Sequence, residues 1–85
     1  MLAIIDYGSG NLRSVAKSFE RVSEGKIDIR ITSNPESLDR ASHIVLPGVG
    51  AFADCMQGLK NVPGMLQSLE NAVKNRGVLF LGICV

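Results

Sequence analysis

One stretch in the middle of the chain decides the fold: Ile44-Val45-Leu46-Pro47-Gly48-Val49-Gly50-Ala51-Phe52. Its first three residues are all apolar, which predicts a strand buried on both faces, as in a parallel sheet. Residues 47–50 contain one proline and two glycines and therefore predict a loop. Apolar residues then recur at helical spacing, at Phe52, Cys55, Met56 and Leu59. A strand, a glycine-rich loop and a helix in this order form half of a βαβ unit.

Toward the amino end, the same alternation of strand and helix is predicted. Leu2–Ile5 is a short apolar strand, and Asn11 is a candidate N-cap for the helix that follows it. The apolar face of that helix comprises Leu12, Val15, Ala16, Phe19 and Val22. Residues 26–32 alternate between isoleucine and polar side chains, which predicts an edge strand with one solvated face. Asn34 and Pro35 then predict the start of a short helix.

Toward the carboxyl end, one more helix and one more strand are predicted. The helix has its apolar face at Leu66, Leu69, Ala72 and Val73. Residues 78–81 form a fourth, buried strand, followed by Gly82-Ile83-Cys84-Val85. One edge strand and three buried ones suit a parallel sheet in the order 2-1-3-4, the flavodoxin-like three-layer arrangement. In such sheets ligands bind at the carboxyl ends of the strands, so the loops at 6–11, 47–50 and 82–85 should converge on one crevice.

Composition excludes several classes of function. The chain of 85 residues is 46% hydrophobic and 20% charged, which indicates one cored domain rather than a disordered tail. The net charge of +1 offers no electrostatic basis for binding nucleic acid or an anionic membrane. The longest apolar run is too short to span a bilayer. Two cysteines 29 positions apart make neither a zinc pattern nor a disulfide framework, so we expect no metal, no cofactor and a cytoplasmic location.

Three segments could carry chemistry, and each also has a purely structural interpretation. Cys84 follows a buried strand and a glycine, as in a nucleophile elbow, but the local sequence by itself favours a packed core cysteine. The loop at 47–50 could supply backbone N–H groups to an oxyanion hole, or be an ordinary Pro-Gly turn. The turn at 6–11 could hold a phosphate. It is not a dinucleotide fingerprint, because Arg13 stands where glycine or alanine is needed.

Two further residues could be mistaken for catalytic groups. His43, the single histidine, opens the third strand at the amino edge of the sheet, away from the crevice. We therefore interpret it as a surface residue rather than a base for Cys84. Cys55 lies on the apolar face of its helix and is interpreted as a core residue.

Taken together, the motifs resemble a known family. Residues 6–15, residues 46–52 and residues 82–85 are similar, in this order, to the glutaminase subunits of imidazole glycerol phosphate synthases, which are class I glutamine amidotransferases. The resemblance runs the length of the chain. It implies that residues 1–85 are the amino-terminal part of one amidotransferase domain, truncated after the strand that bears the nucleophile.

The resemblance also implies residue roles. Cys84 would attack the side-chain amide of glutamine, and the backbone N–H groups of Val49 and Val85 would hold the oxyanion. Gly48 and Gly50 would belong to the substrate-binding loop. Asn11 and Arg13 would lie at the interface with a cyclase subunit, a (β/α)8 barrel that receives the ammonia and makes imidazole glycerol phosphate in histidine biosynthesis.

In the family, the catalytic histidine and glutamate lie further along the chain, so we expect the 85 residues alone to be inactive. Two alternatives remain open at this point. One is another flavodoxin-like superfamily member with an elbow cysteine. The other is a non-catalytic module that binds phosphate or flavin at the 6–11 turn.

Overall fold

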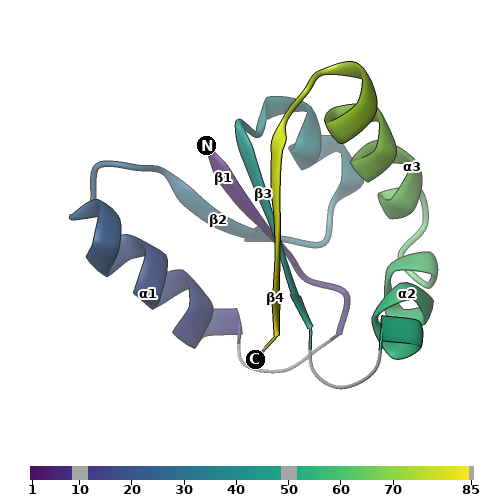
Figure 1. Cartoon of the computed structure of the whole chain (residues 1–85), viewed down its shortest axis with the longest axis horizontal. Helices are drawn as coiled ribbons and strands as arrows, with labels where there is room; N and C mark the ends of the chain where they lie inside the picture. The colour runs from purple at the N-terminus through teal and green to yellow at the C-terminus, as the bar shows by residue number, and fades with distance from the viewer. Residues whose placement is uncertain (9–11, 49–51, 85) are drawn as a thin grey trace.

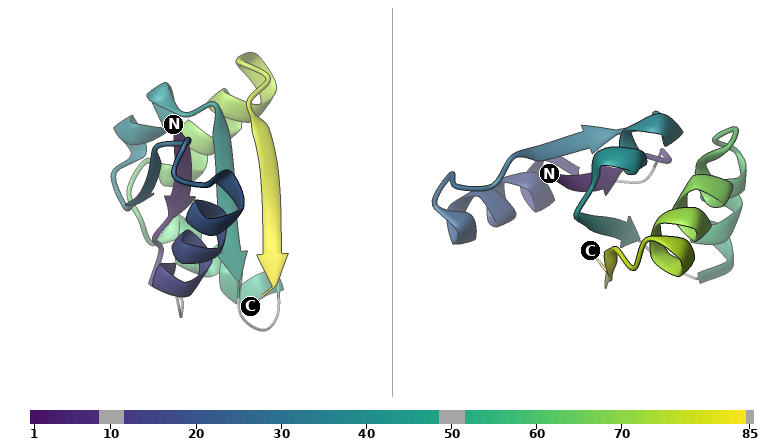
Figure 2. Two further views of the ribbon diagram at one scale, coloured as in Figure 1. Left: turned by 90° about the vertical axis from the view of Figure 1, so that its left-hand side faces the viewer. Right: turned by 90° about the horizontal axis from the view of Figure 1, so that it is seen from above.

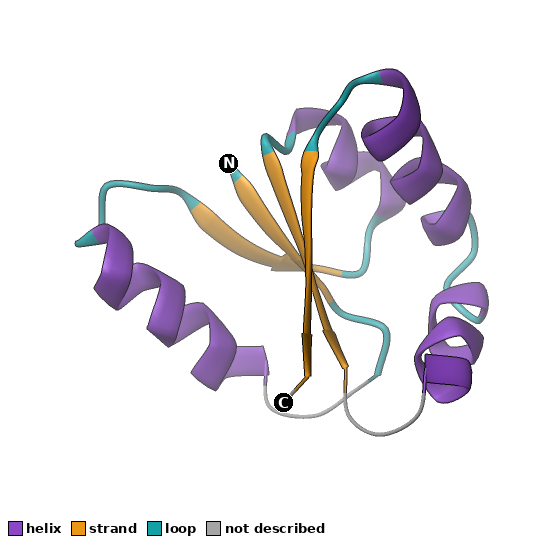
Figure 3. Cartoon of the chain, viewed as in Figure 1, coloured by secondary structure: helices purple, strands orange, loops and turns teal. Residues whose placement is uncertain are grey.

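The chain folds as an α/β structure in which strands and helices alternate (Figure 1). The computed structural model describes residues 1–8, 12–48 and 52–84, and for residues 52–55 and 84 it describes the backbone alone. The strands are β1 (Leu2–Ile5), β2 (Ile29–Thr32), β3 (His43–Gly48) and β4 (Leu79–Cys84). The helical elements are α1 (Leu12–Ser23), η1 (Pro35–Arg40), α2 (Phe52–Lys60), α3 (Met65–Glu70) and η2 (Asn71–Asn75) (Figure 3).

The described strands form one parallel sheet in the order β2-β1-β3-β4. This confirms the predicted fold class and strand order. The register of β1 with β3 ends at the pair Ile4 and Val45. The register of β3 with β4 continues to the pair Gly48 and Cys84. β3 therefore continues beyond its pairing with β1 and, from Leu46 to Gly48, pairs with β4 alone.

Helices cover both faces of the sheet, which gives three layers (Figures 1 and 2). On one face, α1 packs Val15 against β1 and β3. On the other face, η1, α2 and α3 bury a larger cluster around Ile5 and Ile44. The fully buried side chains of that second cluster include Leu38, Leu59 and Met65. The short apolar strands β1 and β3 thus form the centre of the core, as their sequences indicate.

The boundaries of several elements differ from the sequence prediction. β3 and β4 extend through Gly48 and Cys84, so residues 47–48 and 82–84 are strand rather than loop. β2 begins at Ile29, not at residue 26, and Ile27 is exposed. The helix starting at Pro35 is of the 3₁₀ type, and the Asn34 side chain accepts a hydrogen bond from the Glu36 N–H at its start. The helix therefore begins where the sequence predicts, but it is wound more tightly than an α-helix.

Several apolar residues are more exposed than their periodicity predicts. Val22 is 84% exposed, because it lies in the last turn of α1 and belongs to neither core cluster. In the region of α3 and η2, Met65, Leu69 and Ala72 are buried, whereas Leu66 and Val73 are only partly covered. β4 was predicted to be buried, yet Leu79 is 66% exposed and Leu81 50% exposed. The reason is that β4 is an edge of the described sheet, with a neighbour on one side only.

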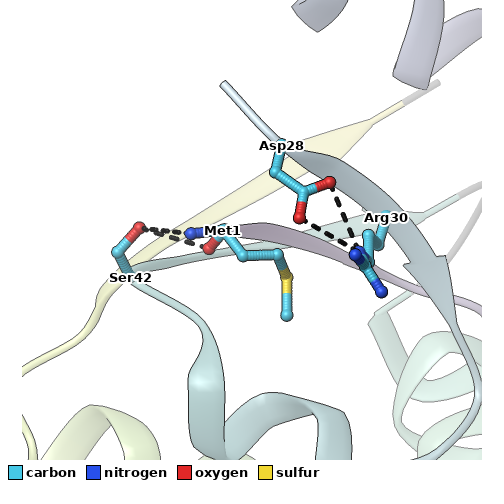
Figure 4. A network of polar contacts seen from close by, with 4 residues as sticks. All are labelled: Met1, Asp28, Arg30 and Ser42. Carbon is cyan, nitrogen blue, oxygen red and sulfur yellow. Dashed lines mark hydrogen bonds and ion pairs between the residues drawn. The ribbon is translucent and has the colours of Figure 1, made fainter. Parts of the chain in front are cut away.

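Polar contacts hold the amino ends of the strands in place (Figure 4). The Ser42 hydroxyl donates to the Met1 carbonyl at 3.2 Å and accepts from the terminal amine at 3.4 Å. On β2, the Arg30 guanidinium forms an ion pair with Asp28 at 3.1 Å. Before β4, the Arg76 guanidinium donates to the carbonyls of Leu38 and Ala41, at 2.8 and 3.0 Å. These contacts tie the edge opposite the proposed crevice to η1 and to the turn before β4.

Candidate active site

The carboxyl ends of β3 and β4 bring two of the predicted site segments together. Gly48 and Cys84 are paired residues on these adjacent parallel strands. Paired strands run about 4.8 Å apart, so the backbone of Cys84 lies beside the last residue of β3. Gly48 is half-buried. The sequence places Val49 one peptide bond after it. The strand pairing thus sets the cysteine next to the start of the glycine-rich segment.

Tyr7, two residues after β1, connects the same region to the rest of the fold. Its phenolic O–H donates a hydrogen bond to the main-chain carbonyl of Pro47. Its ring is partly buried against the core cluster on the η1, α2 and α3 face. Tyr7 was not singled out in the sequence, where it stands within a glycine-rich turn.

Gly58 in α2 makes room for that ring. A Cβ atom built on Gly58 would lie 2.4 Å from Cδ2 of Tyr7 and 3.3 Å from its carbonyl oxygen. The contact of 2.4 Å is shorter than real Cβ atoms make, so any side chain at Gly58 would displace the ring or the helix. A glycine inside an amphipathic helix is unfavourable by about 1 kcal/mol relative to alanine and generally has a packing reason. Gly58 was therefore the signal in the sequence that could have identified a close contact here.

In the turn after β1, the Asp6 side chain accepts a hydrogen bond from the backbone of the same turn. The Gly8 N–H donates to Oδ1 of Asp6 at 3.1 Å, and Gly8 has a positive φ of 94°. A carboxylate therefore occupies the position from which backbone N–H groups would contact an anion. Because a phosphate would be repelled by this carboxylate, the geometry disfavours phosphate binding at the 6–8 part of the turn.

His43 lies at the opposite end of the sheet from Cys84. It pairs with Leu79, the first residue of β4, whereas Cys84 is the last. At about 3.3 Å per residue, the five intervening steps separate them by about 16 Å. His43 is exposed, and its Nδ1 lies 2.9 Å from the Ser42 hydroxyl. The interpretation of His43 as a surface residue is confirmed.

Arg13 is exposed on the first turn of α1. It lines a groove of about 510 Å³ between α1 and the edge strand β2, together with Lys17 and Glu20 of the same helix. The floor of this groove includes Ile29 and Ile31. The predicted interface residue thus faces a mixed polar and apolar surface on the α1 side of the sheet.

Several predicted site residues lie outside the described part of the chain. These are Asn11, Val49, Gly50 and Val85, and the side chains of Cys55 and Cys84. Gly82 is described, and a Cβ atom there would meet no atom within 4 Å. Among the described residues, none is therefore close enough to require a glycine at position 82.

Two kinds of feature are absent from the described residues. Within residues 1–8, 12–48 and 52–84, no group of three or more His, Cys, Asp or Glu side chains is arranged to hold a metal ion. Among the helices in the same ranges, none is both long and apolar enough to cross a membrane.

The fold and this edge of the sheet define a class: a parallel α/β protein with a cysteine at the carboxyl end of β4, beside a glycine-rich segment. Comparison with known proteins is more specific. The chain is 51% identical over 87 aligned positions to the imidazole glycerol phosphate synthase subunit HisH of Rhodopseudomonas palustris. It is 51% identical to the HisH subunit of Zymomonas mobilis and 55% identical to that of Agrobacterium fabrum.

These alignments confirm the resemblance that the three motifs indicated. Each covers 99% of this chain. The chain spans about two fifths of the length of these relatives, 39% or 40% in each case. No family model matches the chain.

Proposed function

We propose that the full-length protein hydrolyses glutamine to glutamate and ammonia, with Cys84 as the nucleophile. The observation that carries the proposal is the pairing of Cys84 with Gly48 at the carboxyl edge of the sheet. This pairing puts the backbone of Cys84 beside the start of a segment with two glycines, and a glycine-rich segment can turn backbone N–H groups toward a reacting carbonyl. The similarity to HisH subunits along 99% of the chain supports the same reaction.

The proposed reaction has two steps. The Cys84 sulfur forms a bond to the side-chain amide carbon of glutamine, and the carbon–nitrogen bond breaks as the nitrogen takes up the thiol proton and leaves as ammonia. Water then adds to the thioester carbon, the carbon–sulfur bond breaks, and glutamate and the thiol are released. The N–H groups of Val49 and Val85 hold the oxyanion in both steps, and Gly48 and Gly50 shape the loop that binds glutamine.

The proton transfers need a base that lies near the thiol. The one histidine of these 85 residues is His43, and it is on the far edge of the sheet. We therefore propose that the base comes from another part of the full-length protein. The ammonia would pass to a cyclase partner with a (β/α)8 barrel, in a cytoplasmic heterodimer that serves histidine biosynthesis.

Glutamate release by the full-length protein tests this function. We expect release in the presence of the barrel subunit and of that subunit's own substrate. The proposal is wrong if purified full-length protein, with both present, releases no glutamate above the uncatalysed rate.

The 85-residue chain by itself should not turn over glutamine. A thiol without a base is mostly protonated at neutral pH and is then a weak nucleophile. The measurement is glutamate release by the purified chain beside the full-length protein at equal concentration. Sustained turnover by the 85-residue chain, lost in its Cys84→Ala variant, would show that a base is present within these residues.

The docking surface for the cyclase is proposed to include Asn11 and Arg13. Arg13 is exposed at the start of α1, on the edge of the sheet where Cys84 lies. In the full-length protein, Arg13→Ala should raise the Kd for the barrel subunit by about three- to tenfold, the effect of losing one interfacial charge. The matched control is Lys26→Ala. Lys26 lies near the amino edge of the sheet and its side chain is 80% exposed, so its removal should leave the Kd unchanged.

If Arg13→Ala changes neither the Kd for the barrel subunit nor the stimulation of glutamate release by that subunit, Arg13 is not an interface residue.

A further inference from the structure

One side chain, Tyr7, contacts both elements that flank residues 49–51. Its phenol donates a hydrogen bond to the carbonyl of Pro47, near the end of β3. Its ring contacts α2 at Gly58, six residues after that helix begins at Phe52. In the sequence, Val49, the proposed oxyanion donor, comes two residues after Pro47. We propose that Tyr7 is a positioning residue that holds the end of β3 in register with Cys84, an inference that rests on the function proposed above.

The strand pairing explains why such a contact is needed. β3 pairs with β1 as far as Val45, but with β4 as far as Gly48. On its β1 side, the end of β3 therefore lacks a paired strand in the described structure. β1 itself ends at Ile5, and the chain turns away. The phenol of Tyr7 donates a hydrogen bond to the Pro47 carbonyl of β3. Pro47 lies beyond Val45, the last residue of β3 that pairs with β1.

The position of the accepted hydrogen bond matters for catalysis. The Pro47 carbonyl belongs to the peptide group immediately before the one that joins Gly48 to Val49. Pro47 is buried, so its carbonyl needs a partner there. Fixing this peptide sets the position from which the next one, between Gly48 and Val49, can rotate, because Gly48 itself permits a wide range of dihedral angles. Tyr7 therefore positions the last described peptide before the proposed donor.

The ring contact adds a second restraint. Gly58 permits α2 to approach the Tyr7 ring more closely than any side chain would allow. The start of α2, at Phe52, follows the loop directly. Tyr7 consequently joins the end of β3, which its phenol contacts, to the second half of α2, which its ring contacts.

The test uses the full-length protein in complex with its barrel subunit. Tyr7→Phe keeps the ring and its contact with Gly58 but removes the hydroxyl. We expect kcat for glutamate release to fall about three- to tenfold, the effect of one lost hydrogen bond, with KM for glutamine changed less than about twofold. Alkylation of Cys84 by iodoacetamide, a direct displacement that uses no oxyanion hole, should proceed at the wild-type rate.

Ser42→Ala is the matched control. It also removes a hydroxyl that links two segments about 40 residues apart, but at the amino edge of the sheet. Its kcat should equal that of the wild type. An equal loss of kcat in Ser42→Ala and Tyr7→Phe would show a general effect on stability, and would overturn the inference.

Gly58→Ala is a second, independent variant. It should lower kcat because the added Cβ displaces the ring and with it the phenol. The loss in the double variant with Tyr7→Phe should be smaller than the product of the two single losses, since the phenol is already absent. Full kcat in Tyr7→Phe, while Cys84→Ala is inactive, would overturn the role of Tyr7 alone. Absence of glutamate release from the wild-type complex would overturn the proposed function itself, and the inference with it.

Discussion

Cys84→Ala in the full-length protein is expected to abolish glutamate release, a loss of at least about 10⁴-fold in kcat. The reason is that the thioester cannot form without the sulfur, and water attacking the amide directly has no comparable route. The measurement is glutamate release in the complex with the barrel subunit and its substrate. Binding of the barrel subunit should remain, because Cys84 is the last residue of a strand that still pairs with β3.

The second cysteine supplies the control. Cys55 lies in α2, a separate element from β4. Cys55→Ala should keep most of the wild-type kcat, and iodoacetamide should still inactivate it in proportion to the modification of Cys84. Glutamate release by Cys84→Ala at more than about 1% of the wild-type rate would contradict the assignment of the nucleophile. If Cys55→Ala loses activity while its melting temperature is unchanged, Cys55 is the nucleophile instead.

Val49→Pro should reduce the stimulated kcat by about 10²- to 10³-fold, the usual cost of removing one oxyanion donor. Proline has no backbone N–H, so the substitution deletes the proposed donor while keeping an apolar side chain. KM for glutamine should change much less, because the donor acts on the charge that develops in the transition state. The measurement is steady-state kinetics of the full-length complex with the partner's substrate bound.

Val49→Ala is the control for this variant, since it shortens the side chain and keeps the N–H. It should retain kcat within a few-fold of the wild type. The stimulation by the partner's substrate should also persist in Val49→Ala, because the peptide between Gly48 and Val49 can still rotate at low steric cost. If Val49→Pro retains full stimulated turnover while Cys84→Ala has none, the oxyanion donor is a different group.

Much of the fold could be predicted because it depends on local patterns. The apolar runs at Leu2–Ile5 and at 44–46 could only be strands covered on both faces, and the alternating pattern around Ile29 and Ile31 could only be an edge. With helices between them, these strands permit few arrangements other than a parallel sheet with right-handed connections. The predicted order 2-1-3-4 was therefore correct.

Where each element stops was less predictable. Glycines at 48 and 82 suggested loops, yet both lie in strands, because β3 and β4 pair with one another beyond Leu46 and Leu81. Pairing between segments separated by more than 30 residues overrides the local preference of a glycine. Helices show that local patterns also fail to predict which residues are buried. The spacing of Val22 fits the apolar face of α1, but Val22 is exposed because it belongs to no core cluster.

By itself, the sequence determined the class of fold, the edge of the sheet where the glycine-rich segments gather, and the candidate nucleophile at Cys84. The first two follow from hydrophobic periodicity and from the rule that parallel strands end at a common edge, whereas the role of Cys84 follows from the resemblance of the motifs to glutaminase subunits. Only the tertiary structure decided that Cys84 pairs with Gly48, and that Tyr7 joins Pro47 to Gly58. The physical reason is distance along the chain. Tyr7 is 40 residues from Pro47, and no local pattern of hydrophobicity or turn residues specifies which carbonyl a phenol will reach after the sheet has assembled.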